Sequence, residues 1–342
     1  MQRGLAPLII NYMKLIESKA EYIPQENGIG GIYKMIEVAG RTAYHSLDKI
    51  TPTSAKDFVD RMIRSKHGAA LEHGTVCLRF SNTKEQEGYY GMRAFDRYRF
   101  NPYSKITYNF IGGNANKFNG CMYIVTNYRV LVENNWLDDL KYLSYPTEFH
   151  EKRYTMKFTC SRAIAQELTR HRTFSFLMES QRYINYSKER HGGEITFIKP
   201  SWLNVPTGIV YWHDGICWRV QQDENNPMEW FSVMPQERFS EKEAQVASTY
   251  FDALSYAEEK YFFLLRENCQ PQQARDVLPN ATKTELIMTG FASDWRHVFD
   301  LRLFGKTGAP HPDMVDLMQK AQIAMQEAGV WKDIMNKPSK FK

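Results

Sequence analysis

Helix-spaced and strand-spaced hydrophobic residues mix along this chain without the regular alternation that builds a parallel α/β fold. Apolar residues recur at helical spacing over residues 29–46 and 54–65, whereas residues 154–160 and 282–290 alternate as in strands. This order predicts an α+β protein with mixed helices and a mainly antiparallel sheet. With 342 residues, of which 43% are hydrophobic, the chain can bury a sizeable core.

We expect a single elongated domain over residues 1–342, because no linker divides the chain and no internal repeat is present. Two stretches, 84–153 and 200–239, are predicted insertions. Residues 84–118 are rich in Gly, Asn, Tyr and Arg and have weak periodicity, so a long loop is expected there. The second insertion holds tryptophans among turn residues.

Capping signals predict where several helices begin. Ser161 is expected to cap a helix that ends near Thr169. Ser240 and Glu243 form a capping box at the start of the longest predicted helix. Pro312 suits the first turn of a helix, which we expect to be the last in the chain.

Composition and cysteine usage indicate the cellular setting. The five cysteines are scattered and contain no CxxC pair, so we expect neither a disulfide framework nor a zinc knuckle, and a reducing cytoplasm fits best. The N-terminal residues lack a signal-peptide pattern, and no apolar run approaches the ~20 residues of a membrane span. A net charge of +5 suits an anionic small molecule as well as nucleic acid.

The densest group of donor side chains is the RHR sequence at residues 170–172, which Ser180 follows after a short apolar stretch. Arginine is suited to bidentate recognition of phosphate and carbonyl oxygens. If the preceding helix ends near Thr169, both arginines project to one side of an extended segment and the histidine projects to the other. The alternative is a solvated basic helix end. The apolar residues 173–178 favour partial burial, and therefore a ligand.

Two further arginines, Arg275 and Arg302, lie in the C-terminal third. One strand and most of a helix separate them, so both can return to the same side of the fold. The alternative for Arg275 is an ion pair with Asp276 or Glu267, and the alternative for Arg302 is a pair with Asp300. Together with the RHR sequence, they favour a shared site.

Other chemistries fit the sequence less well. His67 and His73 lack the spacing of a helical zinc pair, so we expect no metal. Ser180 has no GxSxG setting, and Cys160 is expected to be a small buried residue. Residues 30–31 are a Gly pair that matches neither a Walker A loop nor a Rossmann fingerprint, so any dinucleotide is held in another way.

These elements together resemble the flavin-dependent thymidylate synthases. The RHR with Ser180 resembles the RHR-x7-S signature of the family, and the SQRY sequence that ends at Tyr183 is typical of it. HGAALEH resembles the family's early H-x4-EH element, and ARDVLPN resembles its AR-x-x-LP segment. SDWRHVFDLR and GAPHPDM resemble its C-terminal helix and the histidine that follows. The agreement covers residues 28–82, 154–199 and 240–330.

The resemblance implies a methyltransferase of thymidylate biosynthesis that converts dUMP to dTMP by reductive methylation. Methylenetetrahydrofolate would donate the one-carbon unit, and FAD reduced by NADPH would supply the hydride. The partners implied are these small molecules and further copies of the chain, in a homotetramer with shared active sites. Neither nucleic acid nor a membrane is an expected partner.

The resemblance also assigns site residues. Arg302 and Ser180 would be catalytic, with Arg302 drawing charge toward the N3 edge of uracil. The residues expected to bind dUMP are Glu167, Arg170, Glu179, Ser180, Gln181, Arg182, Arg275 and Arg302. The residues expected to bind FAD are His67, Ala69, Glu72, Arg170, His171, Arg172, Ser293 and His297.

Two positions depart from the family pattern. Glu167 stands where many members have Gln, and Met178 stands where many have Glu or Gln, with Glu179 as the neighbouring acid. The alternative from a different functional class is a nucleic-acid-binding protein, rich in Arg and aromatic residues, without catalysis. That alternative predicts strongly salt-dependent binding and a colourless protein.

Overall fold

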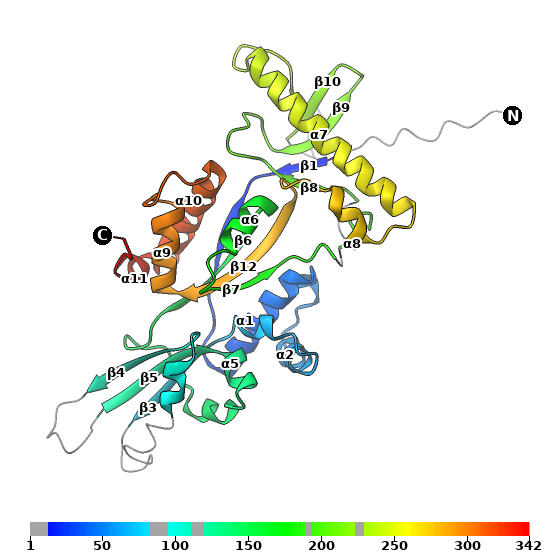
Figure 1. Cartoon of the computed structure of the whole chain (residues 1–342). Coiled ribbons are helices and arrows are strands. Elements are labelled where there is room, and N and C mark those ends of the chain that lie inside the picture. Colours follow the sequence, from blue (N-terminus) through cyan, green and yellow to red (C-terminus); the bar gives the residue numbers. More distant parts are fainter. Residues whose placement is uncertain are drawn as a thin grey trace.

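The computed structural model describes residues 13–81, 95–110, 120–182, 184–188, 193–222 and 229–341. These residues form a mixed α+β fold, as the sequence predicts, but with three sheets instead of one (Figure 1). The sheets have the strand orders β11-β10-β9-β1-β8, β2-β6-β12-β7 and β3-β5-β4. Strand β1 runs parallel to β8, and the other paired strands are antiparallel.

The strands have the bounds β1 Met13–Ile16, β2 Lys19–Ile23, β3 Thr75–Ser81, β4 Lys105–Phe110, β5 Gly120–Asn127, β6 Arg153–Ser161, β7 Ser175–Met178, β8 Thr196–Ile198, β9 Gly208–His213, β10 Cys217–Gln221, β11 Trp230–Ser232 and β12 Lys283–Phe291. The α-helices are α1 Gly28–Ala43, α2 Ser54–Arg64, α3 Gly68–Leu71, α5 Tyr128–Glu133, α6 Arg162–Leu168, α7 Glu241–Arg266, α8 Pro271–Ala274, α9 Ala292–Arg302, α10 Pro312–Glu327 and α11 Trp331–Met335. The 3-10 helices are η1 Leu47–Lys49, η2 Phe95–Phe100, η3 Leu137–Tyr142 and η5 Arg275–Val277.

The central sheet, β2-β6-β12-β7, positions the predicted site. Its two long strands pair over their full length, with Phe158 opposite Leu286 and Met156 opposite Met288. These four side chains are fully buried and face helices α6, α9 and α10, where Trp295 belongs to the same core. Helix α1 contacts β12 and β7 and lies against the opposite face. The sheet therefore has helices on both faces, and α6 and α9 share one of them (Figure 1).

The sheet β3-β5-β4 corrects the expectation of a long loop at residues 84–118. Helix η2 and strand β4 lie within that stretch, while residues 82–94 and 111–119 fall outside the described part of the chain. Among the described residues, strand β4 pairs with β5 alone, and its side chains from Lys105 to Asn109 are half-buried, so its sequence carries a weak alternation. Its partner β5 lies in a different sequence segment, so local periodicity alone misses the pairing.

The predicted insertion at 200–239 supplies the strands β9, β10 and β11. They extend a sheet that β1 and β8 begin, and α7 packs on them. The indole nitrogen of Trp218 donates to Asp252 Oδ1 of α7 at 2.8 Å, and the Trp218 ring packs against Phe251. Trp218 is therefore buried beneath α7, whereas Trp202, Trp212 and Trp230 are exposed.

The capping predictions are confirmed, whereas the end of the chain is corrected. The Ser161 hydroxyl accepts from the backbone N–H of Ile164 at 3.3 Å, and Ser240 with Glu243 forms the capping box of α7. Pro312 begins α10, but the five-residue helix α11 follows it. Gly329, with φ of 73°, separates these helices, and α11 is too short to give a clear periodic signal.

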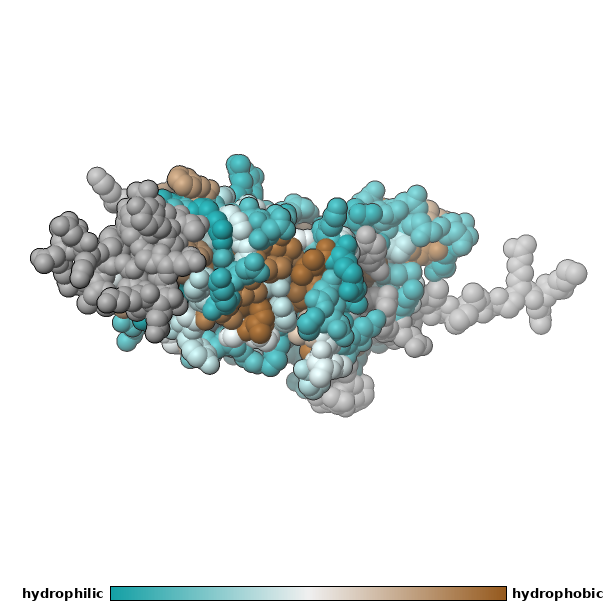
Figure 2. Space-filling view, turned by 90° about the horizontal axis from the view of Figure 1, so that it is seen from below, coloured by the Kyte–Doolittle hydropathy of each residue, from teal (hydrophilic) through white to brown (hydrophobic). Residues whose placement is uncertain are grey.

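The surface is mainly hydrophilic on the face seen in Figure 2, with a compact apolar area near its centre. No helix in the described parts of the chain combines the length and apolar character that crossing a membrane requires.

The tight contact of Gly290 with the core leads to a stability prediction. A Cβ built on Gly290 of β12 would lie 2.3 Å from the ring of Phe174, which packs edge-on against Trp295 in the core. We expect Gly290→Ala to lower the free energy of unfolding by about 1–3 kcal/mol through overpacking. Gly30→Ala is the matched control, because a Cβ there meets nothing within 4 Å. Urea unfolding followed by circular dichroism compares them, and equal stability of the two variants would contradict the prediction.

Candidate active site

The RHR sequence lies in the turn between α6 and β7. Helix α6 ends at Leu168 with Thr169 as its C-cap, as predicted, and β7 begins at Ser175. His171 is buried, whereas both arginines of the RHR are exposed. The expected partial burial therefore holds for the histidine and is wrong for the two guanidinium groups. They face solvent and lie at the C-terminal end of α6, where the helix dipole favours cations.

Arg302 joins the end of α9 to the end of α6. Its Nη1 donates to Glu167 Oε2 at 2.9 Å, and its Nη2 donates to the Glu167 backbone carbonyl at 3.3 Å. Its Nε donates to His171 Nε2 at 3.2 Å. The alternative partner, Asp300, is instead fully buried and pairs with Arg296 and Lys306. Residues two apart project in different directions on a helix, so Arg302 and Asp300 do not meet.

The ring of His171, which accepts a hydrogen bond from Arg302, lies beside the ring of His297. Their ring centroids lie 6.3 Å apart, edge to face, and the Phe341 ring stacks on His297 with a centroid distance of 5.4 Å. Burial, followed by the charge of Arg302, lowers the pKa of His171 to about 4. His171 is therefore neutral at pH 7, with Nε2 as an acceptor. Phe341 was missed because it belongs to no motif and no periodic element.

A second group of predicted residues begins where β7 ends. Glu179 is buried, and its carboxylate contacts His45 Nδ1 at 2.8 Å and Lys283 Nζ at 3.2 Å. Burial raises the pKa of Glu179, but the hydrogen bond with His45 and the charge of Lys283 outweigh it and lower the pKa. The Ser180 backbone N–H donates to the Ala43 carbonyl at 3.2 Å. Glu179 therefore holds the start of the Ser180 segment in place.

Arg275 approaches this second group from η5. Burial lowers the pKa of Arg162, at the start of α6, and the nearby charge of Arg275 adds to the effect. Gln181 is buried and Arg182 is exposed, while Tyr183 lies outside the described residues. In the part of the chain that the structure describes, no ion pair joins Arg275 to its neighbouring acids. Arg162 was not predicted, although it directly follows the cap of α6.

Most of the residues predicted to bind dUMP or FAD thus divide into two groups. The α6–α9 group contains Glu167, Arg170, His171, Arg172, His297 and Arg302. The β7-end group contains Glu179, Ser180, Gln181, Arg182 and Arg275. The four residues of β7 separate the two groups along the chain, and at ~3.3 Å per residue they span roughly 13 Å. The two groups therefore lie at opposite ends of one strand.

Three residues predicted to bind FAD lie at α3, which contacts strand β7. Ala69 is exposed, and His67 is exposed with its Nδ1 2.9 Å from the Tyr44 hydroxyl. Glu72 forms an ion pair of 2.5 Å with Arg129 of α5. His73 points into the core, where its Nδ1 lies 2.7 Å from Thr289 Oγ1. Among the described residues, no group of three His, Cys, Asp or Glu side chains has the arrangement of a metal site.

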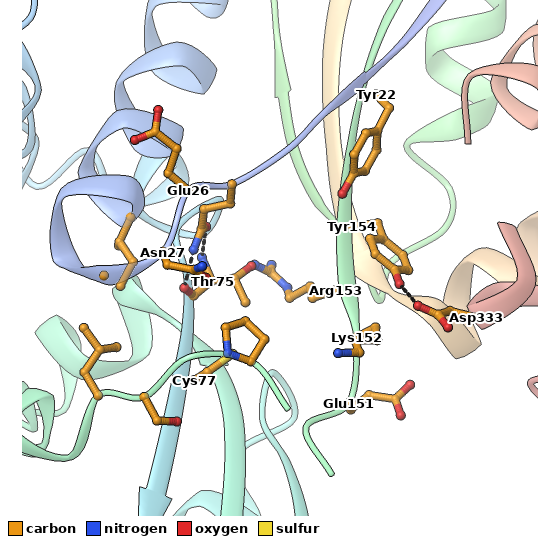
Figure 3. A pocket seen from close by; sticks show the side chains of 16 residues that line it. Tyr22, Glu26, Asn27, Thr75, Cys77, Glu151, Lys152, Arg153, Tyr154 and Asp333 are labelled. Atoms are coloured by element: carbon orange, nitrogen blue, oxygen red, sulfur yellow. Dashed lines mark hydrogen bonds between the residues drawn. The ribbon is translucent and has the colours of Figure 1, made fainter. Parts of the chain in front are cut away.

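A separate cavity of about 250 Å³ lies between the start of α1 and the strands β3 and β6 (Figure 3). Arg153 reaches across it to donate to Thr75 Oγ1 at 3.1 Å and to Ser175 Oγ at 2.9 Å. The Tyr154 hydroxyl donates to Asp333 of α11 on the opposite side (Figure 3). None of the predicted site residues lines this cavity. It therefore neighbours the predicted site without belonging to it.

Arginines at both ends of β7, on an α+β scaffold, make this a cationic site suited to an anionic ligand. The family model of the thymidylate synthase complementing proteins matches residues 122–326. The chain belongs to this family. The matched range contains the predicted site residues other than the three at α3.

Curated relatives agree with the family. A flavin-dependent thymidylate synthase of Corynebacterium efficiens is 32% identical over 146 residues, which cover 42% of this chain and 46% of the relative. A protein of the same name from Haloarcula marismortui is 30% identical, covering 42% of this chain and 51% of the relative. The chain thus matches about half the length of these relatives. The UMP/dUMP methylase PolB of Streptomyces cacaoi is 15% identical with a TM-score of 0.41, covering 95% of this chain and 98% of that chain.

The lowered pKa of His171 gives a prediction about stability and pH. Because the folded pKa, about 4, lies below the ordinary 6.5, the unfolded chain binds more protons between these values. The contribution of His171 is complete above pH 6.5 and is lost as the pH falls toward 4. The free energy of unfolding of the wild type should fall between pH 7 and pH 4.5, because His171 gains a proton more readily in the unfolded chain. We expect this fall to be smaller by about 2–3 kcal/mol in His171→Gln, which keeps an acceptor for Arg302.

Urea unfolding of both proteins at the two pH values measures this difference. The wild-type chain serves as the reference, because the other buried histidines are the same in both proteins. An equal loss of stability in the wild type and the variant would show that His171 titrates normally in the folded chain.

Proposed function

We propose that this protein methylates dUMP to dTMP, with methylenetetrahydrofolate as the one-carbon donor and FAD, reduced by NADPH, as the source of the hydride. Membership of the family, whose relatives are named flavin-dependent thymidylate synthases, supports the reaction class. The observation that carries the proposal is Arg302, fixed by Glu167 and His171 at the end of α9.

Arg302 would polarise the uracil ring. A guanidinium group has five donors, and three of them bind Glu167 and His171. The remaining two face a ligand in a fixed direction, because the other three hold the plane of the group. A preorganised cation of this kind stabilises negative charge that develops on a carbonyl oxygen and ring nitrogen. Neutral His171 orients Arg302 without adding a second charge that would compete with it.

The residues present fit an FAD group. Arg170 and Arg172 are exposed and offer bidentate donors for phosphate or carbonyl oxygens. His297 Nδ1 is buried and has no hydrogen-bond partner among the described residues, so it remains available to a ligand. When bound, the reduced flavin would supply the hydride for the reaction. The protein's part would be to hold the flavin and exclude water, with Ser293 and the α3 residues at its edges.

The assembly would be a homotetramer with shared active sites. The α6–α9 group and the β7-end group lie at opposite ends of β7, an arrangement that would let a second copy contribute one group to a shared site. Ser180 would act from the β7-end group, with Arg182 and Arg275 as partners for the phosphate.

Each chain would be a single domain over residues 1–342. The insertions 84–153 and 200–239 support this, because they add strands to sheets that β3 and β1 begin. The protein would work in the cytoplasm, a setting that suits its five free thiols.

Flavin binding separates this proposal from the alternative of a nucleic-acid-binding protein. We expect the purified protein to be yellow or to take up FAD in equimolar amount, with absorbance near ~450 nm from the flavin itself. With NADPH and methylenetetrahydrofolate, it should convert dUMP to dTMP, which chromatography detects. A colourless protein that binds no FAD but binds oligonucleotides in a strongly salt-dependent way would favour the alternative.

Arg302→Ala tests the role of the fixed guanidinium. We expect dTMP formation to fall by about 100-fold or more, because an electrostatic donor to the reacting ring is lost. FAD affinity, measured by quenching of flavin fluorescence, should change little. Loss of FAD binding instead would mean that Arg302 holds the cofactor.

Mixing variants tests the shared site within the same experiment. Arg302→Ala and Arg275→Ala should each be inactive, whereas random mixed oligomers should regain about a quarter of the wild-type activity. If both arginines served a site within one copy, the mixture would stay inactive.

A further inference from the structure

Strand β4, in the predicted insertion, brings Lys105 to the start of α9. Lys105 pairs with Val125 of β5, and Val125 packs with Cys77 of β3 and Phe291, the N-cap of α9. The sheet β3-β5-β4 therefore docks on the residue that begins α9. This placement directs a lysine of the insertion toward the first turn of α9, which holds Ser293, a predicted FAD contact.

The Lys105 ammonium contacts three groups at this junction. Its Nζ donates to Ser293 Oγ at 2.5 Å and lies 3.7 Å from Glu151 Oε1. It also lies 4.3 Å from the centroid of the Phe291 ring. Burial lowers the pKa of Lys105, although the charge of Glu151 opposes the shift. The side chain of Lys105 is 35% exposed.

Positive charge exceeds negative charge around Lys105. Lys337 pairs with Glu151 at 2.6 Å, and Lys340 lies 3.9 Å from Asp294. Three lysines therefore surround two carboxylates, and one positive charge is left over. A surplus of this kind favours an anion, and the free phosphate oxygens of a dinucleotide carry the most charge of the groups in FAD.

The hydrogen bond between Lys105 and Ser293 also leaves donors for a ligand. Because the Ser293 oxygen accepts from the ammonium, its own O–H can donate elsewhere. An ammonium has three donors, and Ser293 takes one of them, while Glu151 Oε1 at 3.7 Å is an ion-pair partner beyond hydrogen-bond distance. Both side chains thus offer a hydrogen to the same acceptor, as a phosphate oxygen requires.

We propose that Lys105 is a further cofactor-binding residue, contributed by the insertion, which contacts the phosphate groups of FAD together with Ser293. This inference rests on the proposed function. A purely structural role, in which Lys105 only anchors the sheet β3-β5-β4 to α9, makes a different prediction. An anchor would affect every flavin alike, whereas a phosphate contact affects only flavins that carry phosphate.

The experiment compares FAD with riboflavin, which has the same ring and no phosphate. Flavin-free protein is titrated with each, and the dissociation constants are obtained from flavin fluorescence. We expect Lys105→Met to weaken FAD binding by about 10- to 100-fold, the usual effect of losing a charge-assisted hydrogen bond, with riboflavin binding almost unchanged. Lys105→Arg should recover part of the affinity, because it restores the charge.

Lys141→Met is the matched control. Lys141 also lies in the insertion and over an aromatic ring, 5.1 Å from the Tyr142 centroid, but it is exposed, and no hydrogen bond or ion pair joins it to a predicted site residue in the part of the chain that the structure describes. The FAD affinity of the Lys141→Met variant should equal that of the wild type. Equal losses for FAD and riboflavin in Lys105→Met would overturn the phosphate contact in favour of an anchor.

Failure of this inference is distinguishable from failure of the proposed function. If the wild type binds FAD and Lys105→Met binds it equally well, only the role of Lys105 is wrong. If the wild type takes up no FAD, the proposed function and this inference both fail.

Discussion

The contact between Arg302 and Glu167 depends on where two helices end on one sheet. Helices α6 and α9 follow the antiparallel strands β6 and β12 directly, so they start at opposite ends of the pair and run back over the same face. At ~1.5 Å per residue they are about 10 and 16 Å long, which together nearly equals the length of a nine-residue strand at ~3.3 Å per residue. Their C-terminal ends therefore meet.

This meeting point explains why the site is rich in arginine. Two helix C-termini carry partial negative charge, which favours cations. Arg302 and the two arginines of the RHR turn lie there, and their combined charge exceeds that of the two dipoles and Glu167. Glu167, which stands where many family members have Gln, therefore has a role of its own. It holds Arg302 in one orientation and still leaves a net positive site for an anionic ligand.

The sequence predicts those parts of the fold that depend on contacts between residues close together in the chain. The caps at Ser161 and Ser240 form as expected, because a serine hydroxyl needs only a backbone N–H three residues later. The contact of Lys105 with Ser293 joins residues far apart in the chain, and the pairing of β4 with β5 creates it. The stacking of Phe341 on His297 is also long-range. A periodic pattern within a short stretch of sequence does not predict such long-range contacts.

The division of the predicted site into two groups follows from the same geometry. Strand β7 lies at the edge of the central sheet, and it carries the RHR turn at one end and Ser180 at the other. Glu179 is tied to His45 and Lys283, so the Ser180 segment is not free to fold back toward Arg302. Strand β7 thus separates the α6–α9 group from the β7-end group within one copy of the chain. In the proposed homotetramer, a second copy would contribute one of the two groups to a shared site.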